Sequence, residues 1–163
     1  MRHSSLLTAF ALAAMQATGI SAATVPADYE FASMYEAIPF EMEAVQRPVI
    51  PEYEVSITDF GGINDGHTKN TVAFAAAMKH LSEKGGGKLV VPAGIWYTGP
   101  IVFESNINLH LMSGALILFS SDRDDYPLID SYFEGNSTKR CQSPLSANGK
   151  ENVAITGLGT ING

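Results

Sequence analysis

The sequence has little cysteine and little basic charge. Its single cysteine, Cys141, excludes an intrachain disulfide bond. Ten Lys and Arg residues stand against 17 Asp and Glu, and the resulting net charge of −7 argues against nucleic acid as a partner. This acidic balance does not exclude an acidic polysaccharide, but a site for such a ligand has to gather the few cations locally. With 163 residues, the chain is expected to form one domain at most.

Long hydrophobic runs are also scarce, and the one at the N-terminus is too short and interrupted for a comfortable membrane span. Arg2 precedes a mostly apolar stretch, residues 6–20, and the small residues 21–23 follow it. This pattern predicts a secretory signal peptide, residues 1–23, cleaved after Ala23, and a non-cleaved anchor is the alternative. Export without disulfides favours a secreted or periplasmic bacterial protein, with no membrane partner after cleavage.

Residues 24–50 contain three of the prolines and few periodic signals, and Pro51 follows directly. Proline removes an amide donor and restricts the residue before it, so this region is interpreted as an extended leader. We expect residues 51–163 to contain the folded domain.

A helix is predicted at about residues 70–83. Phe74, Ala77, Met78 and Leu81 fall at i, i+3, i+4 and i+7 and form one apolar stripe. Asn70 is suited to be the N-cap, and Gly85 to be the C-cap glycine that ends the helix.

The residues before this helix predict a strand and a turn. Val55, Ile57 and Phe60 alternate with polar neighbours, as in a half-buried strand. Residues 64–66, Asn-Asp-Gly, are typical of a turn, because Gly66 adopts a positive φ at low cost.

Short apolar strands follow the helix at close spacing: residues 89–91, 95–97, 101–103, 107–109 and 116–118. One amphipathic helix followed by strands of three to five residues predicts an all-β fold, the capped start of a parallel β-solenoid. The helix is well placed to cover the open end, since the first coil of a solenoid has nothing stacked above it.

The sequence contains an imperfect internal repeat. Residues 106–109, Asn-Ile-Asn-Leu, resemble residues 152–155, Asn-Val-Ala-Ile, at an offset of 46 residues. The offset fits either two coils or one coil that carries an insertion at residues 120–146. Asn106 and Asn152 either stack on one another in adjacent coils or are turn residues without such a partner. The polar stretch 120–147 is predicted to be a loop whose length indicates a function or lateral packing.

Several side chains are candidates for a site, each with a structural alternative. Three histidines, His67, His80 and His110, lack metal-ligand spacing, and His110 is interpreted as a core or turn residue. Trp96 and Tyr97 can stack on sugar rings, although packing within a strand is favoured. Lys139 and Arg140 can meet a polyanion, or they form a solvated pair.

Four segments carry a resemblance to a known family: residues 59–74, 85–94, 98–101 and 152–163. They are similar to the corresponding motifs of glycoside hydrolase family 28, the polygalacturonases, most of all to its bacterial branch. The first of these motifs is shared with a broader pectate-lyase-like superfamily, but the combination of motifs favours the polygalacturonases within it. Lys69 stands where this family usually has Asp, and Asn64 where it usually has Gly; both lie in the predicted capping turn.

The resemblance implies a right-handed parallel β-helix that hydrolyses α-linked galacturonate with inversion. Inversion needs an acid and a base roughly 6.5–9.5 Å apart. The family's catalytic and substrate-binding segments, Asn-Thr-Asp, Asp-Asp, Gly-His-Gly and Arg-x-Lys, are not identified in this chain. The pair Asp124-Asp125 lies in the insertion and is interpreted as a solvated loop face or turn. No catalytic, cofactor-binding or metal residue is therefore assigned, and no cofactor is expected.

The resulting expectation is an N-terminal portion of a truncated β-helix enzyme, inactive by itself. The complete protein is expected to be a monomer that acts on pectin, polygalacturonate or rhamnogalacturonan. Two alternatives stay open: a non-catalytic, tailspike-like carbohydrate-binding β-helix, and a polysaccharide lyase.

Overall fold

The computed structural model describes residues 32–34, 39–40, 45 and 47–163. Residues 1–46 and 47–163 form two separate compact units. In the first unit, the described part includes a short 3₁₀ helix, η1 (Ala32–Met34). The predicted signal peptide, residues 1–23, and most of the predicted leader lie outside the described residues. Within the described part, no helix is both long enough and apolar enough to cross a membrane.

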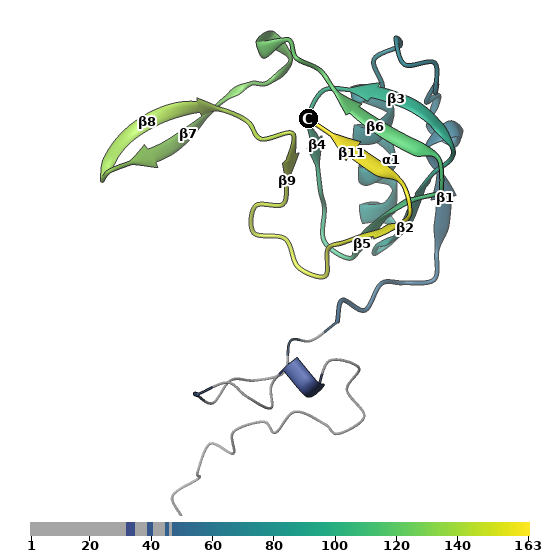
Figure 1. Ribbon diagram of the computed structural model, residues 1–163, viewed down its shortest axis with the longest axis horizontal. Helices are drawn as coiled ribbons and strands as arrows, with labels where there is room; N and C mark the ends of the chain where they lie inside the picture. Colours follow the sequence, from purple (N-terminus) through teal and green to yellow (C-terminus); the bar gives the residue numbers. More distant parts are fainter. Residues whose placement is uncertain (1–31, 35–38, 41–44, 46) are drawn as a thin grey trace, which may run out of the picture. The chain divides into compact units, whose positions relative to one another are not determined.

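The second unit is a parallel β-helix made of three sheets, which are named here A, B and C (Figure 1). Sheet A contains β1 (Glu54–Ser56), β2 (Gly87–Val91), β5 (Ile107–Leu111) and β10 (Ala154–Gly157); sheet B contains β3 (Gly94–Thr98), β6 (Ala115–Phe119) and β11 (Thr160–Asn162); sheet C contains β4 (Ile101–Val102) and β9 (Leu145–Ser146). Every pairing within these sheets is parallel. The chain passes through A, B and C in turn, which confirms the predicted solenoid.

The strand register gives the length of each coil. Gly87 pairs with Ile107, so the coil that starts at β2 has 20 residues. Asn108 pairs with Ala154, so the next coil has 46 residues. Of the two explanations for the repeat, the structure therefore selects one coil that carries an insertion.

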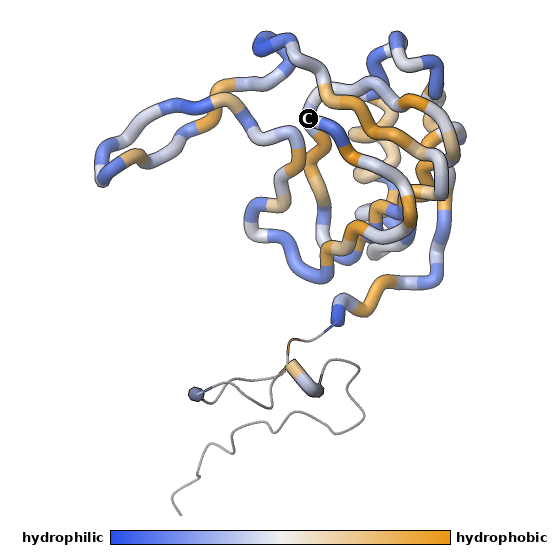
Figure 2. Tube along the Cα trace, viewed as in Figure 1, coloured by the Kyte–Doolittle hydropathy of each residue, from blue (hydrophilic) through white to orange (hydrophobic). Residues whose placement is uncertain are grey.

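The core consists of side chains that point inward from all three sheets. Alternation along each strand places Leu89 above Leu109 and Trp96 above Ile117, and all four are fully buried. Apolar segments follow the strands of the β-helix, while polar residues predominate in the connecting turns (Figure 2). Each coil thus buries one apolar layer against the layer of the next coil.

Helix α1 (Thr71–Glu83) lies between β1 and β2 in the chain and packs against β2 and β4. Its predicted apolar stripe, which includes Phe74 and Leu81, is buried. The helix ends as predicted, because Gly85 has φ 89° and the N–H of Gly86 donates to the carbonyl of Leu81 at 2.8 Å. The predicted role of Gly85 at the C-terminal end of the helix is confirmed.

Two local predictions before α1 need correction. Residues Ile57–Phe60 form a 3₁₀ helix, η2, instead of continuing the strand. The reason is a capping box, in which the N–H of Ser56 donates to Asp59 at 2.9 Å while the Ser56 hydroxyl caps the helix. Asn70 is the N-cap residue of α1, but its side chain makes no capping hydrogen bond.

The insertion is more ordered than the loop that the sequence predicts. A short 3₁₀ helix, η3 (Arg123–Asp125), leads into an antiparallel hairpin of β7 (Leu128–Phe133) and β8 (Asn136–Cys141). The hairpin projects from the body of the β-helix, between β6 and β9 in the chain (Figure 1).

Candidate functional site

The two asparagines of the repeat form a ladder between coils. The Asn152 side-chain amide donates to the Asn106 side-chain oxygen at 3.0 Å. Both residues have a positive φ, 62° for Asn106 and 52° for Asn152, which asparagine tolerates better than most residues. The stacking alternative is confirmed, and these residues hold turns together.

Trp96 and Tyr97 lie on opposite faces of β3. Trp96 is fully buried, and its indole N–H donates to the carbonyl of Pro92 at 2.7 Å. Tyr97 points outward and is half-buried, with its hydroxyl donating to Ser120 Oγ at 2.9 Å. Trp96 thus packs in the core and Tyr97 is engaged by the insertion, so the prediction of packing within the strand is confirmed for Trp96.

The histidines lie far apart in the fold and have different neighbours. His80 Nε2 lies 3.0 Å from the Tyr53 hydroxyl, and His67 lies in the turn around Asp65. His110 points outward from β5, with Nδ1 2.8 Å from the Thr156 hydroxyl of the next coil. Its interpretation as a core or turn residue is therefore wrong. Among the described residues, no group of three His, Cys, Asp or Glu side chains is arranged to hold a metal ion.

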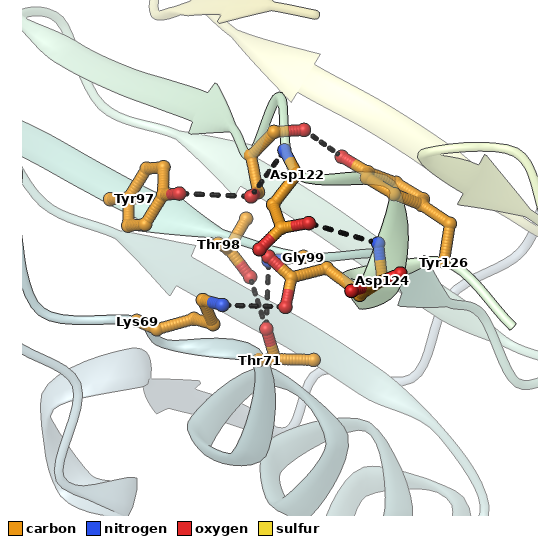
Figure 3. Close-up of polar contacts among 10 residues, drawn as sticks. Lys69, Thr71, Tyr97, Thr98, Gly99, Asp122, Asp124 and Tyr126 are labelled. Carbon is orange, nitrogen blue, oxygen red and sulfur yellow. Dashed lines mark hydrogen bonds and ion pairs between the residues drawn. The ribbon is translucent and has the colours of Figure 1, made fainter.

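A polar cluster that includes Tyr97, Asp122 and Tyr126 surrounds Ser120, the first residue of the insertion (Figure 3). The hydroxyls of Tyr97 and Tyr126 donate to Ser120 Oγ and to its carbonyl, at 2.9 and 2.7 Å. The backbone N–H of Asp122 also donates to Ser120 Oγ, at 3.1 Å. Partial burial raises the pKa of the Tyr126 hydroxyl, which therefore stays protonated and able to donate.

An ion pair between Lys69 and Asp125 connects this cluster to the turn that precedes α1 (Figure 3). Lys69 Nζ lies 2.5 Å from Asp125 Oδ1, and the Asp125 side chain is only 17% exposed. The hydrogen bond from Lys69 lowers the pKa of Asp125, and the same bond raises the pKa of Lys69. The predicted solvated turn is correct for the exposed Asp124 but wrong for Asp125, which is held against the body of the β-helix.

This cluster holds the insertion against the body of the β-helix and is called the clasp below. Its members are Lys69, Tyr97, Ser120, Asp122, Asp125 and Tyr126. An aspartate that Lys69 keeps ionised is a poor proton donor, so Asp125 is unsuited to the acid role that inverting hydrolysis requires. Asp122 is also engaged, since its Oδ1 accepts the N–H of Asp124 at 3.0 Å. The cluster joins the insertion to the first coil, and no local sequence pattern predicts it, because Lys69 and Asp125 are 56 residues apart.

Two grooves lie beside sheet C. One has a volume of about 490 Å³ and lies between α1 and the chain around β4, where Met78 and Val102 contribute apolar surface. The other has a volume of about 760 Å³ and lies between β9 and the base of the hairpin, where Ile129 and Arg140 line it. The cation pair of the sequence analysis is split, because Lys139 pairs with Asp130 at 2.7 Å while Arg140 lines the second groove.

The chain matches no protein-family model, but it is similar to named proteins. A probable polygalacturonase from Vitis vinifera is 39% identical over 68% of this chain and 24% of its own length. An exo-poly-α-D-galacturonosidase from Dickeya chrysanthemi is 33% identical over 67% of this chain and 19% of its own length. The chain thus spans about a quarter or less of these relatives.

Two solved structures have the same fold, a right-handed parallel β-helix. A hyperthermoactive exopolygalacturonase from Thermotoga maritima superposes with a TM-score of 0.68 and 42% identity, over 73% of this chain and 27% of that one. A family 28 exopolygalacturonase from Yersinia enterocolitica superposes with a TM-score of 0.60 and 31% identity, over 75% of this chain and 21% of that one. The chain is therefore homologous, over most of its described β-helix, to about a quarter of a polygalacturonase of glycoside hydrolase family 28.

Proposed function

We propose that this chain supplies the first coils of a pectin-degrading glycosidase that hydrolyses α-linked galacturonate with inversion. The observation that carries the proposal is the 42% identity to an exopolygalacturonase of the same fold. The agreement in both sequence and coil geometry supports a shared chemistry more strongly than the fold alone would, because one fold hosts many functions. We also propose that residues 1–23 direct export, which suits an enzyme whose substrate is an extracellular polysaccharide.

In this proposal, the described residues form part of the scaffold of the enzyme and contain neither the catalytic acid nor the catalytic base. An inverting hydrolase holds a carboxylic acid and a carboxylate on opposite faces of the bond that breaks. Among the described aspartates, Asp122 and Asp125 are taken up by the clasp, and Asp130 pairs with Lys139. We infer that the 163 residues alone do not hydrolyse polygalacturonate.

The proposal is tested with the protein encoded by the gene that contains these 163 codons. Incubation with polygalacturonate should release reducing ends, and proton NMR should show products of inverted anomeric configuration. A polysaccharide lyase would instead produce an unsaturated uronide that absorbs ultraviolet light. Release of that product, or binding of polygalacturonate without turnover, would contradict the proposal.

A further inference from the structure

The groove between β9 and the hairpin has a mixed lining that is suited to a polar ligand. Its floor contains Leu145 and Ser146 of β9, and its outer wall is the base of the hairpin. Amide and hydroxyl side chains, including Gln142 and Asn148, line it together with apolar residues, and so does Asp130, whose carboxylate is paired with Lys139. Sugars present hydroxyls at their edges and C–H groups on their faces, so a lining of this kind complements both.

Arg140 gives the groove a cation that the protein itself does not use. Its side chain has no ion-pair or hydrogen-bond partner among the residues that the structure describes, and it is exposed. Its neighbour Lys139 is already paired with Asp130 at 2.7 Å. The planar guanidinium of arginine presents paired N–H donors that match a carboxylate, so a free arginine in a groove favours a ligand with a carboxylate group.

The rest of the hairpin extends the same face. Arg140 pairs with Ile129 across the hairpin, Ser131 with Thr138, and Phe133 with Asn136. Because side chains alternate along a strand, these three pairs share the hairpin face on which Arg140 lies, and the neighbouring residue Tyr132 lies on the other face. Phe133 is 68% exposed, so its ring is free to stack on a ligand.

We propose that this groove binds an acidic oligosaccharide, with Arg140 holding the carboxylate of one uronate residue and Phe133 stacking on a sugar ring farther along. The inference rests on the proposed function for the identity of the sugar, galacturonate. The chain has an overall charge of −7, so a local cation is needed to offset repulsion of such a ligand. The hairpin is then a binding arm for the substrate chain beside the sheet to which β4 and β9 belong.

The test is a titration with trigalacturonate, followed by amide NMR, of the isotope-labelled 163-residue chain that carries Ile155→Lys and Ile161→Lys to oppose pairing between copies at the exposed edges of β10 and β11. Shifts should concentrate at β9 and the base of the hairpin. Arg140→Gln should weaken binding about tenfold, the loss expected for one charge-assisted hydrogen-bonded pair. Lys84→Gln is the matched control, because it removes the same charge from an exposed lysine outside the groove lining, and it should change the affinity by less than about twofold. Arg140→Lys should recover part of the loss.

A second pair of variants tests the stacking independently. Phe133→Ala should weaken binding, whereas Tyr132→Ala should not, although both side chains are exposed at the hairpin tip. Neither residue belongs to the core, so the amide spectra of the free variants should show an intact β-helix.

The possible outcomes separate this inference from the proposed function. The inference is overturned if trigalacturonate does not bind, if Arg140→Gln binds it as tightly as the unchanged chain, or if a neutral trisaccharide binds equally well. Release of reducing ends by the encoded protein would still support the proposed function in each of these cases. Conversely, Arg140-dependent binding without turnover by the encoded protein would support the groove and contradict the hydrolase.

Discussion

At the scale of single residues, Asn70 shows how a position can be predicted while its role is missed. The sequence places it correctly at the start of α1, but its side chain turns away from the helix. Its amide instead accepts the N–H of Ile63 at 2.8 Å and donates to the carbonyls of Ile63, Thr68 and Tyr97. A propensity for N-caps depends on local chemistry, whereas these partners are brought together only by the fold.

Asn70→Ala should therefore destabilise the β-helix by about 2–4 kcal/mol, because Asn70 is only 2% exposed and its loss removes the side-chain hydrogen bonds to Ile63, Thr68 and Tyr97. Urea unfolding followed by circular dichroism measures the change in free energy. Val72→Ala, at a side chain that is 81% exposed on the same helical turn, is the control and should change it by less than about 0.5 kcal/mol. Equal effects of the two substitutions would refute a special role for Asn70.

The turn at Asp65 gives a prediction for acidic pH. Hydrogen bonds from the backbone of Thr68 and His67, and from the Thr68 hydroxyl, lower the pKa of Asp65 to about 2. A carboxyl group whose pKa is lower in the folded state than its ordinary value of 3.8 stabilises the fold above that value. This stabilisation is lost as the pH falls from about 4 towards 2.

Asp65→Asn should therefore make the free energy of unfolding less dependent on pH between about 4 and 2. Urea titrations at several pH values in this interval, on both proteins, measure the two slopes. Asp124→Asn is a suitable control, because that exposed carboxylate accepts no hydrogen bond in the described structure. An unchanged slope in the Asp65 variant would show that the hydrogen bonds of the turn do not persist in solution.

At the scale of elements, short apolar runs at close spacing made β2, β3, β5 and β6 predictable, and in the structure each of these strands alternates core-facing side chains with outward-facing ones. The hairpin was not predictable in this way, because β8 is exposed along its whole length and has no apolar alternation. The start of η2 did carry a signal, the capping-box spacing of Ser56 and Asp59, which apolar alternation concealed. The clasp and the Arg140 groove depend on contacts between distant segments, for which one sequence has no local pattern.

The two glycines that follow α1, Gly85 and Gly86, can be compared to test how the end of the helix packs against the turn at Asn106. Gly85 has φ 89° and no atom within 4 Å of an added Cβ, whereas a Cβ on Gly86 would lie 2.5 Å from the Asn106 Cβ. Gly85→Ala should cost about 1–2 kcal/mol, from backbone strain alone. Gly86→Ala should cost about 1–3 kcal/mol more, because it also displaces the first step of the asparagine ladder. Thermal unfolding of both variants checks the order, and a Gly85 effect as large as that of Gly86 would contradict it.

At the scale of the whole molecule, successive coils are built in the same way, with an apolar layer inside each coil that packs on the layer of the next. α1 covers the interior of the first coil, and the following coils stack their apolar layers in register upon it. The last described coil lacks such a cover in the structure. Ile155 and Ile161 align with the buried Leu109 and Ile117, yet they are 48% and 37% exposed. The 163-residue chain thus combines exposed apolar side chains with the unpaired backbone edges of β10 and β11 at one face.

Such an edge is a template for pairing with another chain, so the 163-residue chain should self-associate through this face. Ile155→Lys and Ile161→Lys combined should shift sedimentation towards the monomer, because two charges at the edge oppose pairing between copies. Val72→Lys introduces the same charge at an apolar residue that is 81% exposed on α1, and it should leave the association unchanged. Analytical ultracentrifugation over a range of concentrations distinguishes the variants. A monomeric unchanged chain, or equal effects of the end-coil and α1 substitutions, would show that this face does not drive association.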